Sequence, residues 1–171
     1  IMLNNDYDYI SKRKKIENMP IFKKGKEIYD VVRQISDLIP ENDEILQTQI
    51  QFALSDSSQL TIKILDAEGG DLYDIRMENA AIIRKAARDL TVQYHSLVEF
   101  GFEHAEYYLM VRQLVEEFRL LFIDWVAGFD KFNYIIDRWG LFNPPGVGPF
   151  DEDIDDKIGG DFRDFFDEDD E

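Results

Sequence analysis

Residues 71–99 constrain the fold most, because their apolar side chains repeat at the spacing of a long amphipathic helix. A mostly apolar row recurs every three or four positions: Leu72, Ile75, Asn79, Ile82, Ala86, Leu90, Gln93 and Leu97. A second row on the same helix is half polar: Met77, Ala81, Arg84, Arg88, Thr91 and His95. A helix with such an apolar face has to bury it against other helices. The stretch therefore predicts a helical bundle in which the second row is a surface for contact.

Two helices are predicted before this stretch. The first covers residues 20–39, since Pro20 suits a first helical turn whose N–H is unpaired, and Pro40 disfavours helical backbone at the residue before it. The second begins after Asn42 or Asp43, either of which can cap it. We expect it to close at Gly69-Gly70 through left-handed backbone.

The helix predicted last is the longest, because its apolar spacing continues without a break from about residue 103 to 139. Its apolar face consists of Tyr108, Val111, Val115, Phe118, Phe122, Trp125, Phe129, Phe132, Ile136 and Trp139. Residues 129–139 exceed the length of the other helices, so we expect them to overhang the bundle or to turn back at Gly128. The fold class predicted for residues 20–139 is all-α, an antiparallel up-down-up-down four-helix bundle with a long fourth helix.

Both flanks differ in composition from the bundle. Residues 1–19 are interpreted as a mobile N-terminal arm whose basic cluster, residues 12–15, is solvated or contacts phosphate. Residues 140–171 are interpreted as a Pro/Gly linker followed by an irregular acidic tail. Three aromatic residues in this tail suggest that it orders against a partner: Phe162, Phe165 and Phe166.

The composition limits the classes of partner. A net charge of −17 opposes binding to phosphate backbones, which requires clustered Lys and Arg, and it suits a basic protein partner. The sequence contains no cysteine, so disulfides and thiolate metal sites are absent. No apolar run approaches the ~20 residues of a membrane span. The first residues resemble no secretory signal, and we expect a cytoplasmic protein.

Three stretches resemble the four-helix-bundle protein family encoded by intervening sequences of large-subunit ribosomal RNA genes. Ala67-Glu68-Gly69-Gly70 is similar to the ending of that family's second helix, residues 86–97 to its third helix, and residues 114–121 to its last. The resemblance implies a ring-like homo-oligomer without catalytic residues. One branch of the family, the accessory proteins of diversity-generating retroelements, binds a reverse transcriptase and nucleic acid through a basic surface. This chain is acidic where that branch is basic.

Arg88 and His95 carry a second resemblance, to the paired Arg and His of the all-helical HEPN ribonucleases. Their separation is two helical turns, so both side chains lie on one helix face. In that family the His acts as an acid or base, and the Arg stabilises phosphate charge. The resemblance implies an RNA-acting enzyme or a toxin–antitoxin component as the alternative function. In the other interpretation, Arg84 and Arg88 pair with Glu78, Asp89 or acids of a neighbouring helix.

Other chemical sites fail on spacing. Neither His95 nor His104 follows a Glu by three residues, as a di-iron bundle requires. A calcium loop beginning at Asp151 would need Gly where Asp156 stands and Glu where Phe162 stands. We therefore predict no metal and no cofactor. Two polar residues in the apolar row, Asn79 and Gln93, either fix the register of the bundle or line a small polar pocket.

The function predicted from the sequence is that of a non-enzymatic oligomeric adaptor or accessory protein. Its expected partners are further copies of itself and a second protein, with no membrane. The predicted interface residues are Arg84, Arg88, His95, Phe129, Phe132, Ile136, Trp139, Phe162, Phe165 and Phe166. A third idea is that the acidic tail imitates nucleic acid and occupies a basic groove on a partner or on its own assembly.

Overall fold

The computed structural model describes residues 2–153, and within these residues the protein is all-helical, without a strand. It comprises five α-helices and one short 3₁₀ helix: α1 (Met2–Glu17), α2 (Pro20–Ser36), α3 (Glu44–Glu68), α4 (Tyr73–Glu99), η1 (Ala105–Tyr107) and α5 (Tyr108–Ala127). The predicted fold class, all-α, is confirmed.

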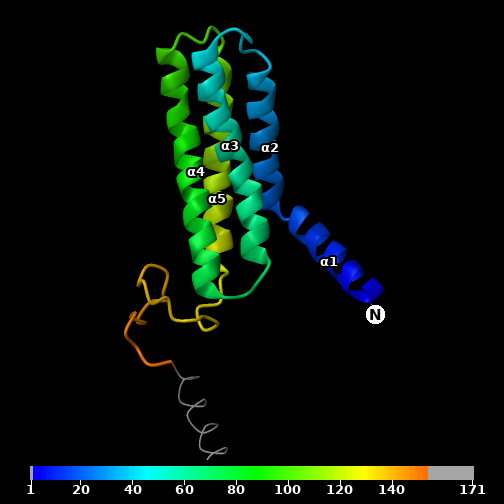
Figure 1. The fold of residues 1–171 in the computed structure, drawn as a ribbon, viewed down its shortest axis with the longest axis vertical. Helices are drawn as coiled ribbons and strands as arrows, with labels where there is room; N and C mark the ends of the chain where they lie inside the picture. The colour runs from blue at the N-terminus through cyan, green and yellow to red at the C-terminus, as the bar shows by residue number, and fades with distance from the viewer. Residues whose placement is uncertain (1, 154–171) are drawn as a thin grey trace, which may run out of the picture.

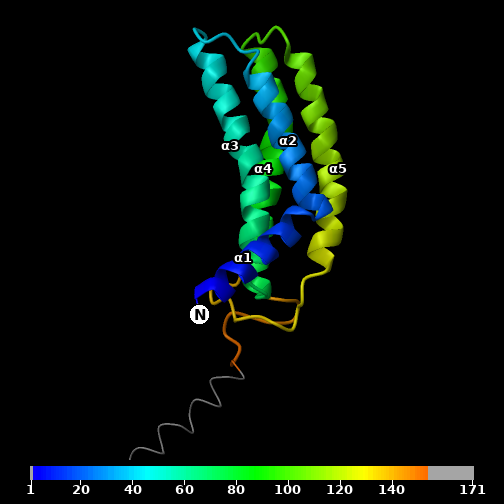
Figure 2. The same cartoon turned by 90° about the vertical axis from the view of Figure 1, so that its right-hand side faces the viewer.

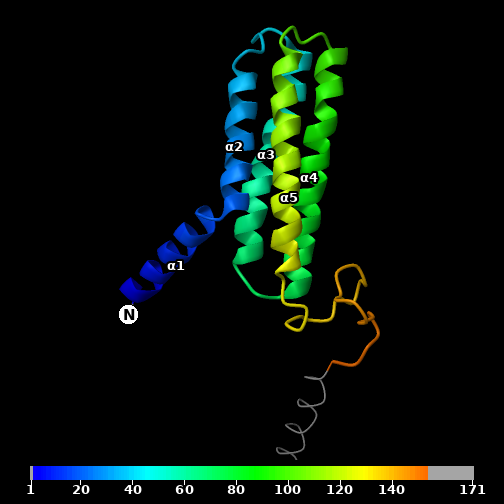
Figure 3. The same ribbon diagram turned by 180° about the vertical axis from the view of Figure 1, so that it is seen from behind.

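Helices α2, α3, α4 and α5 lie side by side (Figure 1). Helix α3 packs against α2 and α4, and α5 packs against the same two helices from the other side. The connections α2–α3 and α4–α5 lie at one end of these helices, and α3–α4 lies at the other (Figure 3). Helix α1 projects to one side of them in Figures 1 and 3, and the turned view in Figure 2 looks from that side, with α1 in front of the lower part of the other helices.

The expected starts of α2 and α3 agree with the structure. Pro20 occupies the first turn of α2. The Asp43 side chain caps α3 by accepting a hydrogen bond of 2.9 Å from the N–H of Leu46. One of the helix's unpaired N–H groups is thereby satisfied.

The predicted closure of α3 by left-handed glycines is wrong. Gly69 has right-handed helical backbone, and the described glycines with positive φ are Gly101, Gly140 and Gly146. The chain instead passes through an extended Leu72, and α4 begins at Tyr73 rather than at Asp71. The Tyr73 N–H donates to the carbonyl of Asn133 at 2.8 Å, so residues from beyond α5 satisfy the start of α4.

The core is a continuous set of apolar side chains contributed by all four packed helices. Its largest fully buried members are Ile28, Val32, Ile50, Leu60, Ile64, Ile83, Leu90, Leu97, Tyr108, Val111 and Phe118. Gly25 permits the close approach of α2 to its neighbours. A Cβ at this position would lie 3.2 Å from Thr61 Cγ2 and 3.5 Å from the Phe118 ring. The absence of a side chain therefore sets the spacing of α2, α3 and α5.

The buried stripe of α4 differs partly from the predicted row. Ile75 and Ile82 are exposed, whereas Ile83 is buried in the core. The predicted polar positions serve the bundle: Asn79 is buried and donates to a carbonyl of its own helix at 3.0 Å. Gln93 donates to Gln49 of α3 at 2.9 Å, a contact that fixes the register of α3 against α4.

The predicted long fourth helix is wrong. It corresponds to α5, which ends at Ala127 with Gly128 as its cap and is shorter than α3 and α4. Beyond Gly128 the chain turns back across the end of the bundle, the second of the two expected arrangements. The Asp130 carboxylate accepts the N–H of Phe132 at 2.9 Å. Such local side-chain bonding competes with helical hydrogen bonds and stops the helix despite its continuing apolar spacing.

The N-terminal segment, expected as a mobile arm, is helical over α1. Its last turns contact α2 and α3. Ile16 is buried, and the Lys12 ammonium donates to the Gly69 carbonyl at 3.1 Å.

Glu68, the last residue of α3, joins three helices at one end of the bundle. Its Oε1 accepts the Trp125 indole N–H of α5 at 2.7 Å and pairs with Arg76 Nη2 of α4 at 2.5 Å. The Arg76 guanidinium lies 4.1 Å from the centre of the Phe129 ring, which packs edge-on against Trp125 at 4.8 Å. The side chains of Glu68 and Arg76 are only 21% and 15% exposed, so this interaction is sheltered from water.

We predict that Glu68→Ala lowers the free energy of unfolding by about 1–3 kcal/mol, because Arg76 and the Trp125 indole both lose their acceptor. Glu68→Gln keeps a neutral acceptor for the indole and should lose less. Urea unfolding followed by circular dichroism measures both. An unchanged midpoint for Glu68→Ala would contradict the role given to this carboxylate.

The Tyr108 hydroxyl is fully buried and has no hydrogen-bond partner among the described residues. Burial is the main cause that raises its pKa well above the usual range, so the group is neutral at any ordinary pH. Tyr108→Phe removes an unsatisfied polar atom and keeps the ring. We predict an increase of about 1 kcal/mol in the free energy of unfolding. The half-exposed neighbour provides the control, since Tyr107→Phe should change stability little. A loss of stability in Tyr108→Phe would overturn the prediction.

Candidate protein-binding surface

Residues 128–153, here called the end segment, cross the end of the bundle beneath α4 (Figures 1 and 3). Large apolar side chains on this segment are exposed to solvent: Phe132, Ile135, Trp139, Leu141 and Phe150. Phe132 is 93% exposed and Trp139 is 91% exposed. Such exposure of large aromatic side chains is typical of a binding surface.

The structure divides the predicted row of interface residues. Phe129 and Ile136 are buried within the chain, at 4% and 7% exposure. Phe129 joins Tyr73 and Ala80 in a small apolar cluster at the end of the bundle. These two predicted interface residues therefore stabilise the chain's own end. Phe132 and Trp139 remain accessible.

Asp137 organises the turn that holds Trp139 outward. Its Oδ1 accepts the N–H of Trp139 at 2.9 Å, and its Oδ2 accepts the N–H groups of Leu141 and Phe142, each at 2.8 Å. The Phe142 N–H is the main cause that lowers the Asp137 pKa below its usual value of 3.8. Gly140 has a φ of +74° within this turn, a conformation that favours glycine.

Further hydrogen bonds fix the rest of the end segment. The Asn143 side-chain Oδ1 accepts the Asp137 N–H at 2.7 Å, and its Nδ2 donates to the Asp137 carbonyl at 2.9 Å. Arg138 donates to the carbonyls of Pro149 and Asp151 at 3.1 and 2.8 Å. The apolar side chains are thus presented on a hydrogen-bonded backbone, so little conformational entropy remains to be lost when a partner binds.

A groove of about 600 Å³ separates the end segment from the first turns of α4. Trp139 and Leu141 line one wall, and the exposed Ile75 of α4 lines the other. The combination of protruding aromatic residues with an adjoining groove gives this surface a shape that a protein partner can match.

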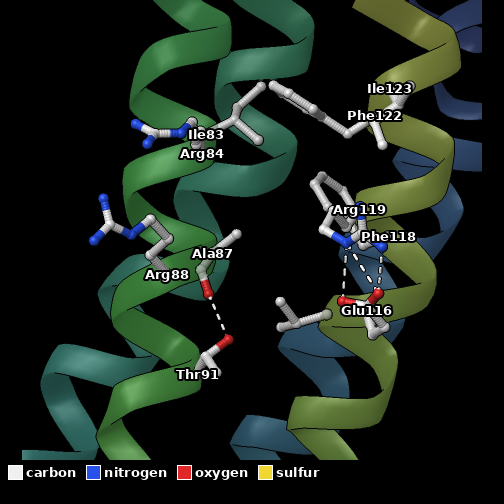
Figure 4. A pocket seen from close by; sticks show the side chains of 11 residues that line it. Ile83, Arg84, Ala87, Arg88, Thr91, Glu116, Phe118, Arg119, Phe122 and Ile123 are labelled. Carbon is white, nitrogen blue, oxygen red and sulfur yellow. Dashed lines mark hydrogen bonds and ion pairs between the residues drawn. The ribbon is translucent and has the colours of Figure 1, made fainter.

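A second groove, here called the α4–α5 groove, runs between the two helices for which it is named and has a volume of about 410 Å³ (Figure 4). Its floor is apolar, with Ile83 of α4 facing Phe118 and Phe122 of α5. Arg84 and Arg88 line the α4 side, and their guanidinium groups extend away from α5 in Figure 4. Their aliphatic stems therefore border the groove, and their charges form its outer rim.

The predicted polar row of α4 lies partly in this groove. Arg84, Arg88 and Thr91 line it, whereas His95 is exposed beyond its lining and packs edge-on against Tyr94 at 5.5 Å. Arg88 and His95, the pair that resembles a ribonuclease motif, thus do not share this cavity.

The ion pairs proposed for the two arginines are not formed between residues 2 and 153. Asp89 pairs with Lys85, and Arg84 and Arg88 have no ion pair among the described side chains. Across the groove, Arg119 pairs with Glu116 at 2.5 Å.

The remaining expectations concern the tail, metals and membranes. Phe162, Phe165 and Phe166 lie outside the described residues. Among residues 2–153, no group of three His, Asp or Glu side chains could hold a metal ion. In the same range, no helix has the length and apolarity to cross a membrane.

Sequence reasoning missed the exposed Ile135, Leu141 and Phe150, and it missed Asp137. The apolar spacing of residues 129–139 was compatible with a helix, which hid the turn. The available signal was an Asp two residues before Trp139 and three before Gly140, a combination that favours an Asx-type turn.

We predict that Asp137→Ala speeds the hydrogen exchange of the Trp139, Leu141 and Phe142 amides several-fold, because each loses its hydrogen-bond acceptor. Asp124→Ala, a change of the same charge on α5, is the control and should leave these amides protected. In the unchanged chain the lowered pKa means that the carboxylate stabilises the turn fully above pH 3.8. This contribution is lost as the pH falls below 3.8 through the lowered pKa. An acid titration of the three amide shifts by NMR should therefore have its midpoint below 3.8.

No family model matches the chain, and searches of curated proteins and of solved structures likewise give no match.

Proposed function

We propose that this chain is a non-enzymatic adaptor or accessory protein that self-associates through its end segment. We further propose that α2–α5 form an antiparallel up-down-up-down four-helix bundle, like that of the ribosomal RNA intervening-sequence family. Connections at alternating ends of these helices support the assignment. The bundle serves as a rigid support that carries a contact surface at one end.

The observation that carries the proposal is the exposure of Phe132 and Trp139 on a fixed backbone. A disordered loop would expose apolar residues transiently, whereas Asp137 and its hydrogen bonds hold Trp139 in one outward position. Fixed, exposed aromatic side chains supply most of the binding energy in many protein interfaces. The unfavourable free energy of exposing these apolar side chains to water is removed when a partner covers them.

Local charge supports a second copy as the partner. The whole chain carries −17, which favours separation of identical molecules. Residues 128–142, however, contain two acids, Asp130 and Asp137, and two bases, Lys131 and Arg138. The part of the end segment that carries Phe132 and Trp139 is therefore neutral. At physiological ionic strength, charges beyond about 8 Å are screened, so apolar contact outweighs the distant repulsion.

The same charge distribution opposes nucleic acid as a principal ligand, since phosphate contacts require a concentration of basic residues. A cysteine-free sequence suits a reducing compartment, and we propose a cytoplasmic location.

We predict that the full chain is oligomeric at micromolar concentration in multi-angle light scattering. Phe132→Ser combined with Trp139→Ser should shift it toward the monomer, because each aromatic side chain contributes about 1.5–3 kcal/mol when it is buried.

The matched control changes two exposed apolar residues away from the end segment, Phe52→Ser with Val92→Ser on α3 and α4. This variant should keep the mass of the unchanged protein. A monomeric unchanged chain, or equal dissociation of both double variants, would refute the proposed interface. Unaltered helical circular dichroism distinguishes dissociation from unfolding.

A further inference from the structure

We infer that the α4–α5 groove is the intramolecular docking site of the chain's own acidic segment, residues 154–171. The groove and the proposed self-association surface are separate, so this inference does not rest on the proposed self-association. It combines the apolar floor of the groove, the charge on its rim and the sequence that follows the described residues.

The groove is a locally basic site on an acidic protein. Three arginines line it, Arg84, Arg88 and Arg119, against one acid, Glu116. Glu116 is already paired with Arg119. Two guanidinium groups that have no ion pair among the described side chains therefore remain on the α4 rim, although the chain as a whole carries −17. This arrangement favours an occupant that carries carboxylates.

The floor of the groove demands apolar anchors as well as charge. Phe118 is buried at its base, and Phe122 and Ile123 border it, with Ile123 half exposed. An occupant with carboxylates alone would leave this apolar surface exposed to water. Aromatic side chains that enter the groove while carboxylates lie over the α4 rim would satisfy both parts.

Residues 154–171 have this composition. They contain nine Asp and Glu residues against Lys157 and Arg163, together with Phe162, Phe165 and Phe166. The spacing of the three phenylalanines is that of apolar anchors which enter a groove between helices.

The connection to the groove is short enough for binding within one chain. Arg138 donates to the Asp151 carbonyl, and Arg138 lines the other groove, between the end segment and the start of α4, together with Asp74 and Glu78. From Glu78, Arg84 and Arg88 lie about 9–15 Å further along α4, at a rise of 1.5 Å per residue. The nine residues from Asp153 to Phe162 can span up to about 30 Å when extended. This extended length exceeds the distance of about 9–15 Å that separates Glu78 from the two arginines along α4.

The experiment uses the full chain and a single introduced cysteine, because the sequence has none of its own. A nitroxide on Asp170→Cys should broaden the methyl signals of Ile83, Thr91 and Ile123 in NMR spectra, so that most of their intensity is lost. The exposed Ile45 and Ile62 on α3 should keep theirs. High salt should restore the groove signals in part, because it screens the arginine contacts.

Arg84→Glu with Arg88→Glu should restore the intensities of the groove methyls. The matched control, Lys26→Glu with Arg33→Glu, makes the same change of net charge on two exposed residues of α2 and should leave the broadening in place. Replacement of Phe162, Phe165 and Phe166 by Ser tests the apolar anchors and should also restore the signals.

A mixture of isotope-labelled chains without nitroxide and unlabelled chains with it identifies the source of the segment. Intramolecular docking leaves the labelled methyls sharp. Broadening in this mixture would place the segment of a second copy in the groove and overturn the inference. Full methyl intensity in the chain that carries both the isotope label and the nitroxide would overturn the inference as well. So would broadening that survives the double change of Arg84→Glu with Arg88→Glu.

Discussion

The sheltered interaction of Glu68 with Arg76 and Trp125 is the constraint on which the order of the end segment depends. Three helices end or begin close to one another, and each brings polar groups that need partners. One carboxylate oxygen serves both an arginine of α4 and an indole of α5. Arg76 in turn lies over the Phe129 ring, so the first residue after the α5 cap is fixed by the same group. The direction in which the chain leaves the bundle follows from this contact.

The end segment acquires its order from that starting point. With Phe129 fixed, the Asn133 carbonyl lies where it accepts the first N–H of α4. The Asp74 carboxylate accepts the N–H of Ile135 at 3.3 Å. Ordering an irregular segment costs about 1–2 kcal/mol per residue in backbone entropy. Burial of Phe129 and Ile136, together with the bonds to Asp137, offsets this cost. The burial of two apolar side chains therefore fixes the backbone that displays the others.

The sequence predicted the helices well and their ends poorly, for physical reasons. Apolar spacing in residues 20–36, 44–68 and 73–99 reports burial on one face, and burial decides whether a long helix forms. The spacing cannot decide where α5 stops, because Phe129 and Ile136 are buried equally well on a returning segment as on a helix. The end is set by Gly128 and Asp130, whose local hydrogen bonding competes with the helix.

The candidate surfaces show the same division between what a sequence reveals and what it hides. Phe132 and Trp139 could be identified as candidates because large apolar residues near the end of a bundle need a cover. The apolar spacing did not show which of the four residues face outward, because this depends on the turn at Asp137. The four are Phe129, Phe132, Ile136 and Trp139. The role of Arg84 and Arg88 depended on Asp89, which pairs with Lys85 and leaves both arginines unpaired within the described structure. The spacing of Arg84 and Arg88 in the sequence does not show whether one of these arginines or Lys85 forms the ion pair with Asp89.

The two surfaces differ in the force that drives occupancy, and this difference separates their roles. Residues 128–142 of the end segment carry equal numbers of acids and bases beside exposed apolar side chains, so the proposed contact there depends on area removed from water and hardly on ionic strength. The α4–α5 groove is flanked by arginines on a chain of strong negative charge, so the docking of residues 154–171 that we propose there would depend on ionic strength. With both surfaces on one bundle, a change in salt or the arrival of a basic partner for residues 154–171 would empty the groove without disturbing self-association. Under both proposals, the bundle would hold an assembly together at its end while α4 and α5 respond to the charge of a partner.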